Sequence, residues 1–373
     1  MKKGPIHRWY CIAEMFPSEL VRKLISNTRG PILDPFAGVG TVLVEAKLLG
    51  LRATGVDVNP FMCFASSVKT RTYDSVGVEY ALNEVLSECK TISVDPESLP
   101  ASNLTKYYNW RTLRRLLTLR QGILGLRQRE AKDLLMLCFS DVAVRAANVK
   151  KSPAPRLTET KGVLPVFEMF RRKVGDVIED VRRFARFDSH VDVFWGDSQD
   201  LSFLQDSYDI VLTSPPYCNN VDYVRHTQLE LYWLGFACQS KDLGEMRRKS
   251  LTSCEAMAHI GKNSSCCEGD VLRLTQELQR HTDRAFPRTV AQYFAGMQSH
   301  LAGIRNLMKP KSRALYVIGD SWIKGVYVPT HKLIAEIAES VGFRNVRLQF
   351  LRTRNSPRRH QFNLSEYLLA MSP

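Results

Sequence analysis

The chain has 373 residues, of which 44% are hydrophobic, so it is long enough for one large domain or two smaller ones, and its composition argues against wholesale disorder. A formal net charge of +14 indicates a polyanionic partner, unless the chain is simply a basic soluble protein. The nine cysteines form no Cys-x-x-Cys pair, and no long apolar run follows the basic N-terminus. We therefore expect a cytoplasmic protein without a metal site, a disulfide framework, a signal peptide or a membrane span.

The first predicted elements are a helix and a strand–helix–strand unit. Residues 17–25 predict the first helix, residues 31–33 a strand, residues 41–49 a second helix and residues 52–57 a second strand. A unit of this kind places a ligand-binding turn at the carboxyl end of its first strand.

The turn of this unit carries Asp34, Gly38 and Gly40. Glycines at such a turn let the backbone approach a ligand closely. Asp57 ends the second strand, where its carboxylate can accept hydrogen bonds from both hydroxyl groups of a ribose. Because residue 43 is Leu, the full dinucleotide fingerprint is missing, and the pattern argues against NAD.

Residues 70–190 are too many for a simple connection within a sheet, and they predict a mainly helical insertion. Residues 105–190 contain 19 Lys and Arg against 9 Asp and Glu, and this excess of 10 is most of the net charge. The predicted helices cover residues 76–86, 113–126, 131–147 and 166–184.

Aromatic and basic side chains are mixed at the start of the second of these helices. The residues concerned are Tyr107, Tyr108, Trp110, Arg111, Arg114 and Arg115. Such a mixture fits a nucleic-acid-binding face, and the alternative is an amphipathic helix whose arginines are simply solvated. Residues 150–156, which include Lys150 and Lys151, predict an exposed loop near the nucleic acid.

Residues 191–217 return to the sheet, with strands predicted at residues 191–195 and 208–212. The second strand leads into Ser214-Pro215-Pro216-Tyr217. The prolines fix the direction of their carbonyl acceptors, the serine adds a hydroxyl group and the tyrosine adds a flat aromatic face. This combination suits a planar heterocycle with an exocyclic amino group, although proline-rich turns after strands are also common.

The stretch Asp34-Pro35-Phe36-Ala37-Gly38-Val39-Gly40-Thr41 and the Ser-Pro-Pro-Tyr motif resemble those of the S-adenosylmethionine-dependent amino-methyltransferases of DNA. Within that family the chain looks most like the N4-cytosine enzymes, because the adenine-N6 relatives usually carry Asp or Asn in place of the serine. The resemblance implies an α/β fold of the Rossmann-like class I methyltransferase type, with a doubly wound, mostly parallel sheet, an antiparallel last hairpin and a helical insertion. It covers roughly residues 1–70 and 191–373.

The resemblance also implies roles for individual residues. A segment before the glycine turn would cover the methionine end of the cofactor, with Tyr10 or Phe16 contributing unless they are core aromatics. Asp34 would face the methionine end, Phe61 would line the adenine, and Asp197 would either approach the adenine amino group or cap the next helix. The expected catalytic residues are Ser214, Pro215, Pro216 and Tyr217. The expected cofactor-binding residues are Asp34, Phe36, Gly38, Gly40, Thr41, Asp57, Asn59, Phe61 and Asp197.

The remaining residues are predicted to complete the sheet. The helices are expected at residues 229–234, 286–308 and 329–341, and the strands at residues 313–319, 345–351 and 366–371. The basic tip between the last two strands, with Arg354 and Arg358, is expected to touch backbone phosphate.

The sequence divides into five predicted segments. They are residues 1–70 (start of the cofactor-binding catalytic domain), 71–190 (basic helical insertion), 191–236 (catalytic core), 237–290 (variable region, a candidate for target recognition) and 291–373 (end of the catalytic domain).

The expected activity is direct methyl transfer to the N4 amine of a cytosine flipped out of duplex DNA. A C5-cytosine mechanism needs a nucleophilic cysteine, typically after a proline, and the sequence contains no Pro-Cys. Double-stranded DNA and a cognate restriction endonuclease acting on the same site are the expected partners. The alternatives are an adenine-N6 DNA or RNA amino-methyltransferase and an inert nucleic-acid-binding module.

Overall fold

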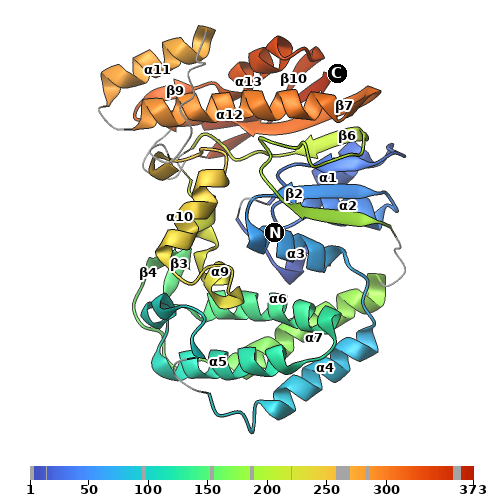
Figure 1. The fold of residues 1–373 in the computed structure, drawn as a ribbon, viewed down its shortest axis with the longest axis vertical. Coiled ribbons are helices and arrows are strands. Elements are labelled where there is room, and N and C mark those ends of the chain that lie inside the picture. The colour runs from blue at the N-terminus through green and yellow to red at the C-terminus, as the bar shows by residue number, and fades with distance from the viewer. Residues whose placement is uncertain are drawn as a thin grey trace.

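The computed structural model describes residues 4–13, 15–94, 98–151, 155–184, 189–219, 221–257, 269–282, 285–355 and 363–373. Its centre is a seven-stranded sheet with the order β10-β11-β7-β6-β1-β2-β5 (Figure 1). The strands are β1 (Ile32–Asp34), β2 (Ala53–Asp57), β5 (Val191–Trp195), β6 (Tyr208–Thr213), β7 (Met308–Gly319), β10 (Arg344–Asn355) and β11 (Asn363–Ser372).

The pairing of these strands is mostly parallel. Every neighbouring pair from β5 to β7 is parallel, whereas β11 is antiparallel to both β7 and β10. The strand order reverses between β1 and β6, and open α/β sheets bind their ligands at such a switch point. The predicted Rossmann-like fold, with an antiparallel last hairpin, is therefore confirmed.

Helices cover both faces of the sheet because its central strands are apolar on both sides. Ile32 and Leu212 pack in the layer of α1 (Ser18–Ile25) and α2 (Thr41–Leu48). The alternate residues Leu33 and Val211 pack on the opposite face. The helices of that second face are α11 (Gly269–His281), α12 (Phe286–Asn306) and α13 (Thr330–Ser340).

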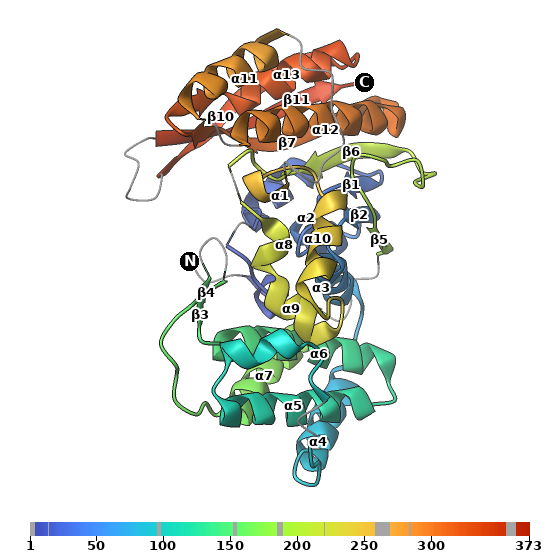
Figure 2. The same ribbon diagram turned by 60° about the vertical axis from the view of Figure 1, so that its left-hand side comes forward.

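A second group of helices lies below the sheet in Figures 1 and 2, on the side of its edge strand β5. Its core includes Phe139 and Trp233, whose ring centroids are 5.2 Å apart, and Tyr108, whose hydroxyl accepts a hydrogen bond from Trp233 Nε1 at 2.8 Å. All four helices predicted between residues 70 and 190 are present. The helices of this group are α3 (Pro60–Thr70), α4 (Ser75–Glu88), α5 (Trp110–Gly125), α6 (Arg129–Ala146), α7 (Val166–Phe184), α9 (Gln228–Leu234) and α10 (Ser240–Lys249).

Short elements complete the chain. Of the expected loop at residues 150–156, residues 150–151 and 155–156 instead pair in a small antiparallel hairpin, and residues 152–154 lie outside the described residues. The short elements are η1 (His7–Trp9), η3 (Ser102–Tyr107), β3 (Val149–Lys151), β4 (Pro155–Leu157), α8 (Tyr223–His226), η4 (Glu255–Met257), β8 (Ser321–Ile323) and β9 (Val326–Val328).

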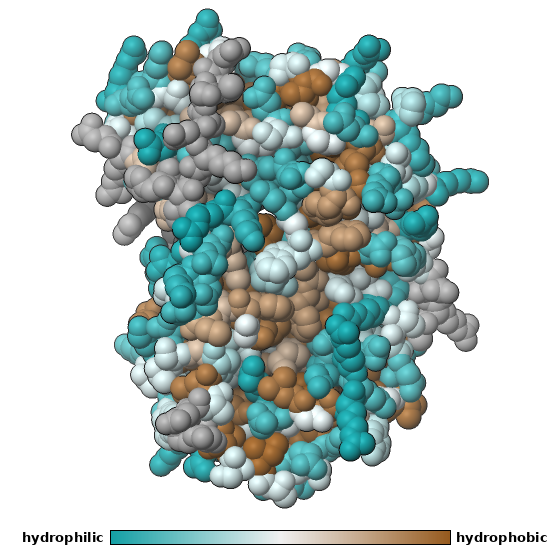
Figure 3. Space-filling view, in the orientation of Figure 1, coloured by the Kyte–Doolittle hydropathy of each residue, from teal (hydrophilic) through white to brown (hydrophobic). Residues whose placement is uncertain are grey.

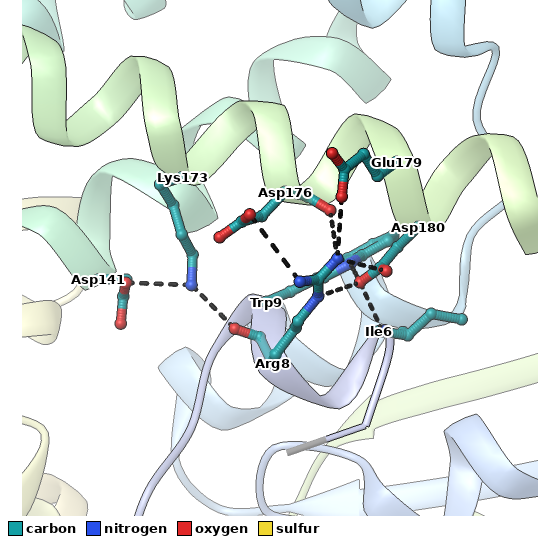
Figure 4. Close-up of polar contacts among 8 residues, drawn as sticks. All are labelled: Ile6, Arg8, Trp9, Asp141, Lys173, Asp176, Glu179 and Asp180. Atoms are coloured by element: carbon teal, nitrogen blue, oxygen red, sulfur yellow. Dashed lines mark hydrogen bonds and ion pairs between the residues drawn. The ribbon is translucent and has the colours of Figure 1, made fainter. Parts of the chain in front are cut away.

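A single buried carboxylate holds the N-terminal segment against α7 (Figure 4). Asp180 accepts hydrogen bonds from the Ile6 backbone nitrogen at 2.9 Å and from Trp9 Nε1 at 3.0 Å. The Arg8 guanidinium donates to the same carboxylate at 2.8 and 3.0 Å. Lys173 Nζ donates to the Arg8 carbonyl oxygen at 2.9 Å. The segment therefore joins the helical group to the sheet through bonds that converge on one buried side chain.

We expect Asp180→Ala to lower the free energy of unfolding by about 3–5 kcal/mol, because it leaves a guanidinium and two further donors without their buried acceptor. Urea unfolding followed by circular dichroism measures the change. Glu179→Ala is the matched control, since Glu179 is exposed and 3.7 Å from Arg8, and its expected effect is below about 0.5 kcal/mol. Equal effects of the two substitutions would contradict this role for Asp180.

Candidate active site

A cavity of about 530 Å³ opens where β1, β2 and β6 end. Its walls come from the N-terminal segment, the turn after β1, the ends of β2 and β6, the segment around α8 and η4, and the last hairpin. The space-filling view shows apolar side chains gathered in the middle of the face between the sheet and the lower helices (Figure 3). The cavity thus occupies the position at which a doubly wound sheet binds its ligands.

The glycine turn contributes Gly38 to this wall. Gly38 has a φ of 51°, and a side chain added there would meet nothing within 4 Å, so backbone conformation rather than space favours glycine. Gly40 and Thr41, both expected at the cofactor, lie outside the wall. A Cβ on Gly40 would come 2.7 Å from the Cβ of Ser66, so Gly40 allows α2 and α3 to pack closely.

Asp57 presents its carboxylate at the end of β2 and lines the cavity. The backbone nitrogens of Gly38 and Asn59 each donate to it at 2.8 Å. The pKa of Asp57 is raised to about 6, because the effect of burial outweighs the lowering effect of these backbone hydrogen bonds. A carboxylate offers about four acceptor positions, so Asp57 can accept further hydrogen bonds from a ligand.

Asp34 lies behind the wall rather than in it. Its Oδ1 accepts hydrogen bonds from Thr213 Oγ1 at 2.7 Å and from the Phe36 backbone nitrogen at 3.2 Å. The pKa of Asp34 is raised to about 7, because burial, together with the charge of Asp57, outweighs the lowering effect of the two hydrogen bonds. Asp34, which was expected to face the methionine end of a ligand, therefore does not line the cavity and holds the turn against β6.

A buried histidine that the sequence did not single out supports the floor of the cavity. The ring of Phe36 lines the cavity and packs on His300 with centroids 4.8 Å apart. The two ring nitrogens of His300 lie 2.7 Å from the carbonyl oxygen of Ser198 and 2.7 Å from the hydroxyl of Tyr316. Because a carbonyl only accepts, Nδ1 carries the proton and Nε2 accepts from Tyr316. Burial lowers the pKa of His300 to about 4, which keeps the ring neutral.

All four residues of the Ser-Pro-Pro-Tyr motif line the same cavity, directly after β6. Cys218 follows them and is fully buried. Burial raises the pKa of the Cys218 thiol to about 12, so it is not a ready thiolate nucleophile. The wall therefore offers a hydroxyl group, carbonyl groups and an aromatic ring, but no activated sulfur next to the motif.

The other expected cofactor residues fall into two sets. Asp197 and Asn59 line the cavity, whereas Phe61 is fully buried against Tyr10, and Met62 takes its place in the wall. The carboxylate of Asp197 accepts from the Gln199 backbone nitrogen at 2.9 Å and closes a turn. Residues 198–219 contain no helix, so the alternative in which Asp197 caps one is wrong.

The N-terminal segment also contributes to the wall. Of the two aromatics considered for the cofactor cover, Tyr10 is a core residue and Phe16 lines the cavity. Ile12 and Met15 line it as well. Sequence patterns gave no signal for the wall residues of the region after α10, which include Leu251 and Met257.

The residues expected at nucleic acid are more widely spread. Tyr108 is buried in the helical core, Tyr107 is half-buried and Trp110 is exposed. Arg354 lines the cavity, and Arg358 lies outside the described residues. The exposed basic residues are Arg111, Arg114 and Arg115 on α5 and Lys150 on β3, next to Lys151.

Two further searches cover only the described residues. No group of three or more His, Cys, Asp or Glu among them could hold a metal ion. None of the helices they form is long and apolar enough to cross a membrane.

No protein-family model matches the chain. It is 26% identical to the Type II methyltransferase M.BsoBI of Geobacillus stearothermophilus over 95% of this chain and 81% of that protein. It is 24% identical to the Type II methyltransferase M.AvaI of Nostoc sp., over 92% of this chain and 80% of that protein. Among solved structures, the rRNA methyltransferase AviRa from Streptomyces viridochromogenes aligns with 100% of this chain and 90% of that chain, at 10% identity and a TM-score of 0.32, which is too low to support an argument. The curated homologues confirm the resemblance to Type II methyltransferases.

We expect the stability of the ligand-free protein to fall between about pH 4 and pH 7 because of Asp34. Its folded pKa of about 7 lies above the ordinary 3.8, so the folded state binds the proton more tightly and loses that advantage as the pH rises. Asp34→Asn should remove the part of this loss that Asp34 contributes and keep the part due to Asp57, so its free energy of unfolding relative to the unmodified chain should rise by up to about 4 kcal/mol across the interval. Urea unfolding at several pH values tests this, with the exposed Asp206→Asn as control. A difference between Asp34→Asn and the unmodified chain that stays constant with pH would refute it.

Proposed function

We propose that this homologue of Type II methyltransferases transfers a methyl group from S-adenosylmethionine to the exocyclic N4 amine of cytosine in duplex DNA. The observation that carries the proposal is that Gly38, Asp57 and the Ser-Pro-Pro-Tyr residues line a single cavity. One part of that cavity suits a ribose and the other a planar base with an amino group.

The cofactor would lie along the ends of β1, β2 and β5. Asp57 would accept from the ribose hydroxyls, and Asp197 would approach the adenine amino group. Phe36 and the N-terminal residues Met15 and Phe16 would cover the rest of the cofactor. S-adenosylmethionine supplies an electrophilic methyl group on a sulfonium. Asp34 would act on it only through the turn that its hydrogen bonds hold.

The exocyclic amine is a poor nucleophile because its lone pair is delocalised into the base. Ser214 Oγ and the Pro215 carbonyl oxygen would accept its two hydrogens, which favours a pyramidal nitrogen with a localised lone pair. Tyr217 would stack on the base, which must leave the helix to enter a cavity of this kind. Positioning and electrostatics then carry the catalysis. The buried, protonated Cys218 argues against a covalent C5-cytosine mechanism.

Duplex DNA would approach the side of the molecule that carries the last hairpin and the β3–β4 hairpin (Figure 2). Arg352 lines the cavity and Lys150 is exposed on β3. The exposed arginines of α5 would add sequence-independent attraction to phosphate. A cytoplasmic location and a cognate restriction endonuclease belong to the same proposal.

We expect unmethylated genomic DNA incubated with the protein and methyl-labelled S-adenosylmethionine to yield N4-methylcytosine. Ser214→Ala should lower turnover by roughly 10²-fold, because an acceptor aimed at the reacting amine is lost, and should leave cofactor affinity unchanged. Nucleoside digestion with mass spectrometry identifies the product, and the exposed Ser207→Ala is the control. N6-methyladenine as the only product would overturn the base assignment, and 5-methylcytosine would overturn the mechanism as well.

We expect Asp57→Ala to weaken S-adenosylmethionine binding by about 1.5–3 kcal/mol, because two charge-assisted hydrogen bonds to the ribose are lost. Isothermal titration calorimetry measures the dissociation constant. Asp206→Ala, which removes an exposed acid before β6, should leave it unchanged. An unaltered dissociation constant for Asp57→Ala would place the ribose elsewhere.

A further inference from the structure

Three residues form a row across the last strands of the sheet. In the strand register, Glu366 of β11 lies opposite Gly319 of β7 on one side and opposite Arg352 of β10 on the other. Directly opposed residues of neighbouring strands point to the same face. Because Gly319 has no side chain, the row leaves a space beside Glu366 at the edge of the cavity.

The ring of Tyr217 occupies that space. A Cβ on Gly319 would come 2.6 Å from Tyr217 Cε2 and 2.4 Å from Arg354 Nη2, so only glycine allows both neighbours to remain. The guanidinium carbon of Arg354 lies 4.7 Å from the centroid of the Tyr217 ring. Arg354 Nη2 donates to the carbonyl oxygen of Asp320 at 2.8 Å, which fixes the cation over the ring.

Glu366 joins these groups. It is only 4% exposed, and its Oε1 accepts a hydrogen bond from the Tyr217 hydroxyl at 3.1 Å. Arg352 Nε donates to Oε2 at 2.5 Å, and Arg354 Nε forms an ion pair with Oε1 at 3.3 Å. Burial and the Glu366 carboxylate raise the pKa of the Tyr217 hydroxyl, which therefore keeps the proton that it donates.

We propose that Glu366 is a positioning residue that fixes the plane of Tyr217 for the target base, with Arg354 holding the ring from one face. The proposal rests on the proposed function, because it assigns the Tyr217 ring to a flipped base. A ring held at its hydroxyl and on one face loses little further freedom when a base stacks on it, so the arrangement is preorganised. Arg354 acts on the ring in this scheme, rather than on backbone phosphate.

The test is a double-mutant cycle with the full-length chain and unmethylated genomic DNA. Glu366→Ala and Tyr217→Phe should each lower kcat/KM for DNA by roughly 10-fold. Because both substitutions remove the same hydrogen bond, kcat/KM of the double variant should be no more than about 2-fold below that of the less active single variant. Glu366→Gln should retain more activity than Glu366→Ala, since its amide oxygen still accepts from Tyr217. The S-adenosylmethionine dissociation constant should stay within about 2-fold throughout. The exposed Glu339→Ala on α13 is the matched control.

Multiplicative losses in the double variant, full activity of Glu366→Ala, or equal weakening of cofactor binding would each overturn the positioning role. If Glu366→Ala does not fold, by circular dichroism, Tyr217→Phe carries the test, because it removes the same hydrogen bond from the other side, and full activity of Tyr217→Phe would then overturn the role. An unmodified chain that methylates no DNA would reject the proposed function itself. An active chain with multiplicative losses would reject only the role of Glu366.

Discussion

The hydrogen bond between Thr213 Oγ1 and Asp34 Oδ1, 2.7 Å long and fully buried, is the contact on which the candidate site depends. Asp34 opens the glycine turn after β1, and Thr213 is the last residue of β6, directly before Ser214. The two strands are parallel neighbours, so the bond ties two motifs that are 179 residues apart to one edge of the sheet. Its cost is the burial of a carboxyl group, which raises the pKa of Asp34 to about 7.

The surrounding structure holds this edge from two directions. On one side, Lys69 Nζ donates to the carbonyl oxygens of Tyr10 at 2.6 Å and Val39 at 3.1 Å, and so joins the N-terminal segment to the glycine turn. The same segment is fastened to α7 by Asp180. On the other side, the last hairpin reaches Tyr217 through Glu366. The helical group and the end of the sheet therefore both act on one cavity, although they are distant in the sequence.

The sequence predicted the elements of the sheet well, because its buried strands are short apolar runs and some helices, such as α1 and α7, repeat apolar residues at helical spacing. It also predicted that Asp57, Gly38 and the Ser-Pro-Pro-Tyr residues belong to strand ends, and parallel strand ends share one edge. It could not separate Phe61 from Met62, since neighbouring positions on a helix differ in direction only once the helix is docked. Likewise, Tyr108 next to several arginines suggested a surface, whereas the extended backbone between η3 and α5 directs it inward to Trp233.

The row of Gly319, Glu366 and Arg352 is a part of the candidate site that could not be predicted from the sequence. It depends on the register of two antiparallel pairs, with a bulge between Phe350 and Arg352, and a shift of one residue would send the Glu366 side chain to the other face. No local pattern in the sequence specifies that register. Site residues that belong to a short sequence motif were predictable. Residues such as Glu366, which reach the site through the pairing of distant strands, were not.

The central claim is that one cavity holds both the cofactor and the target base. A crystal structure of the protein with S-adenosylhomocysteine tests it most directly. The account predicts ribose hydroxyl groups on the Asp57 carboxylate and a sulfur atom directed toward the Ser214–Tyr217 wall. A ligand bound outside this cavity, or bound in it with the sulfur turned away from Ser214, would contradict the account.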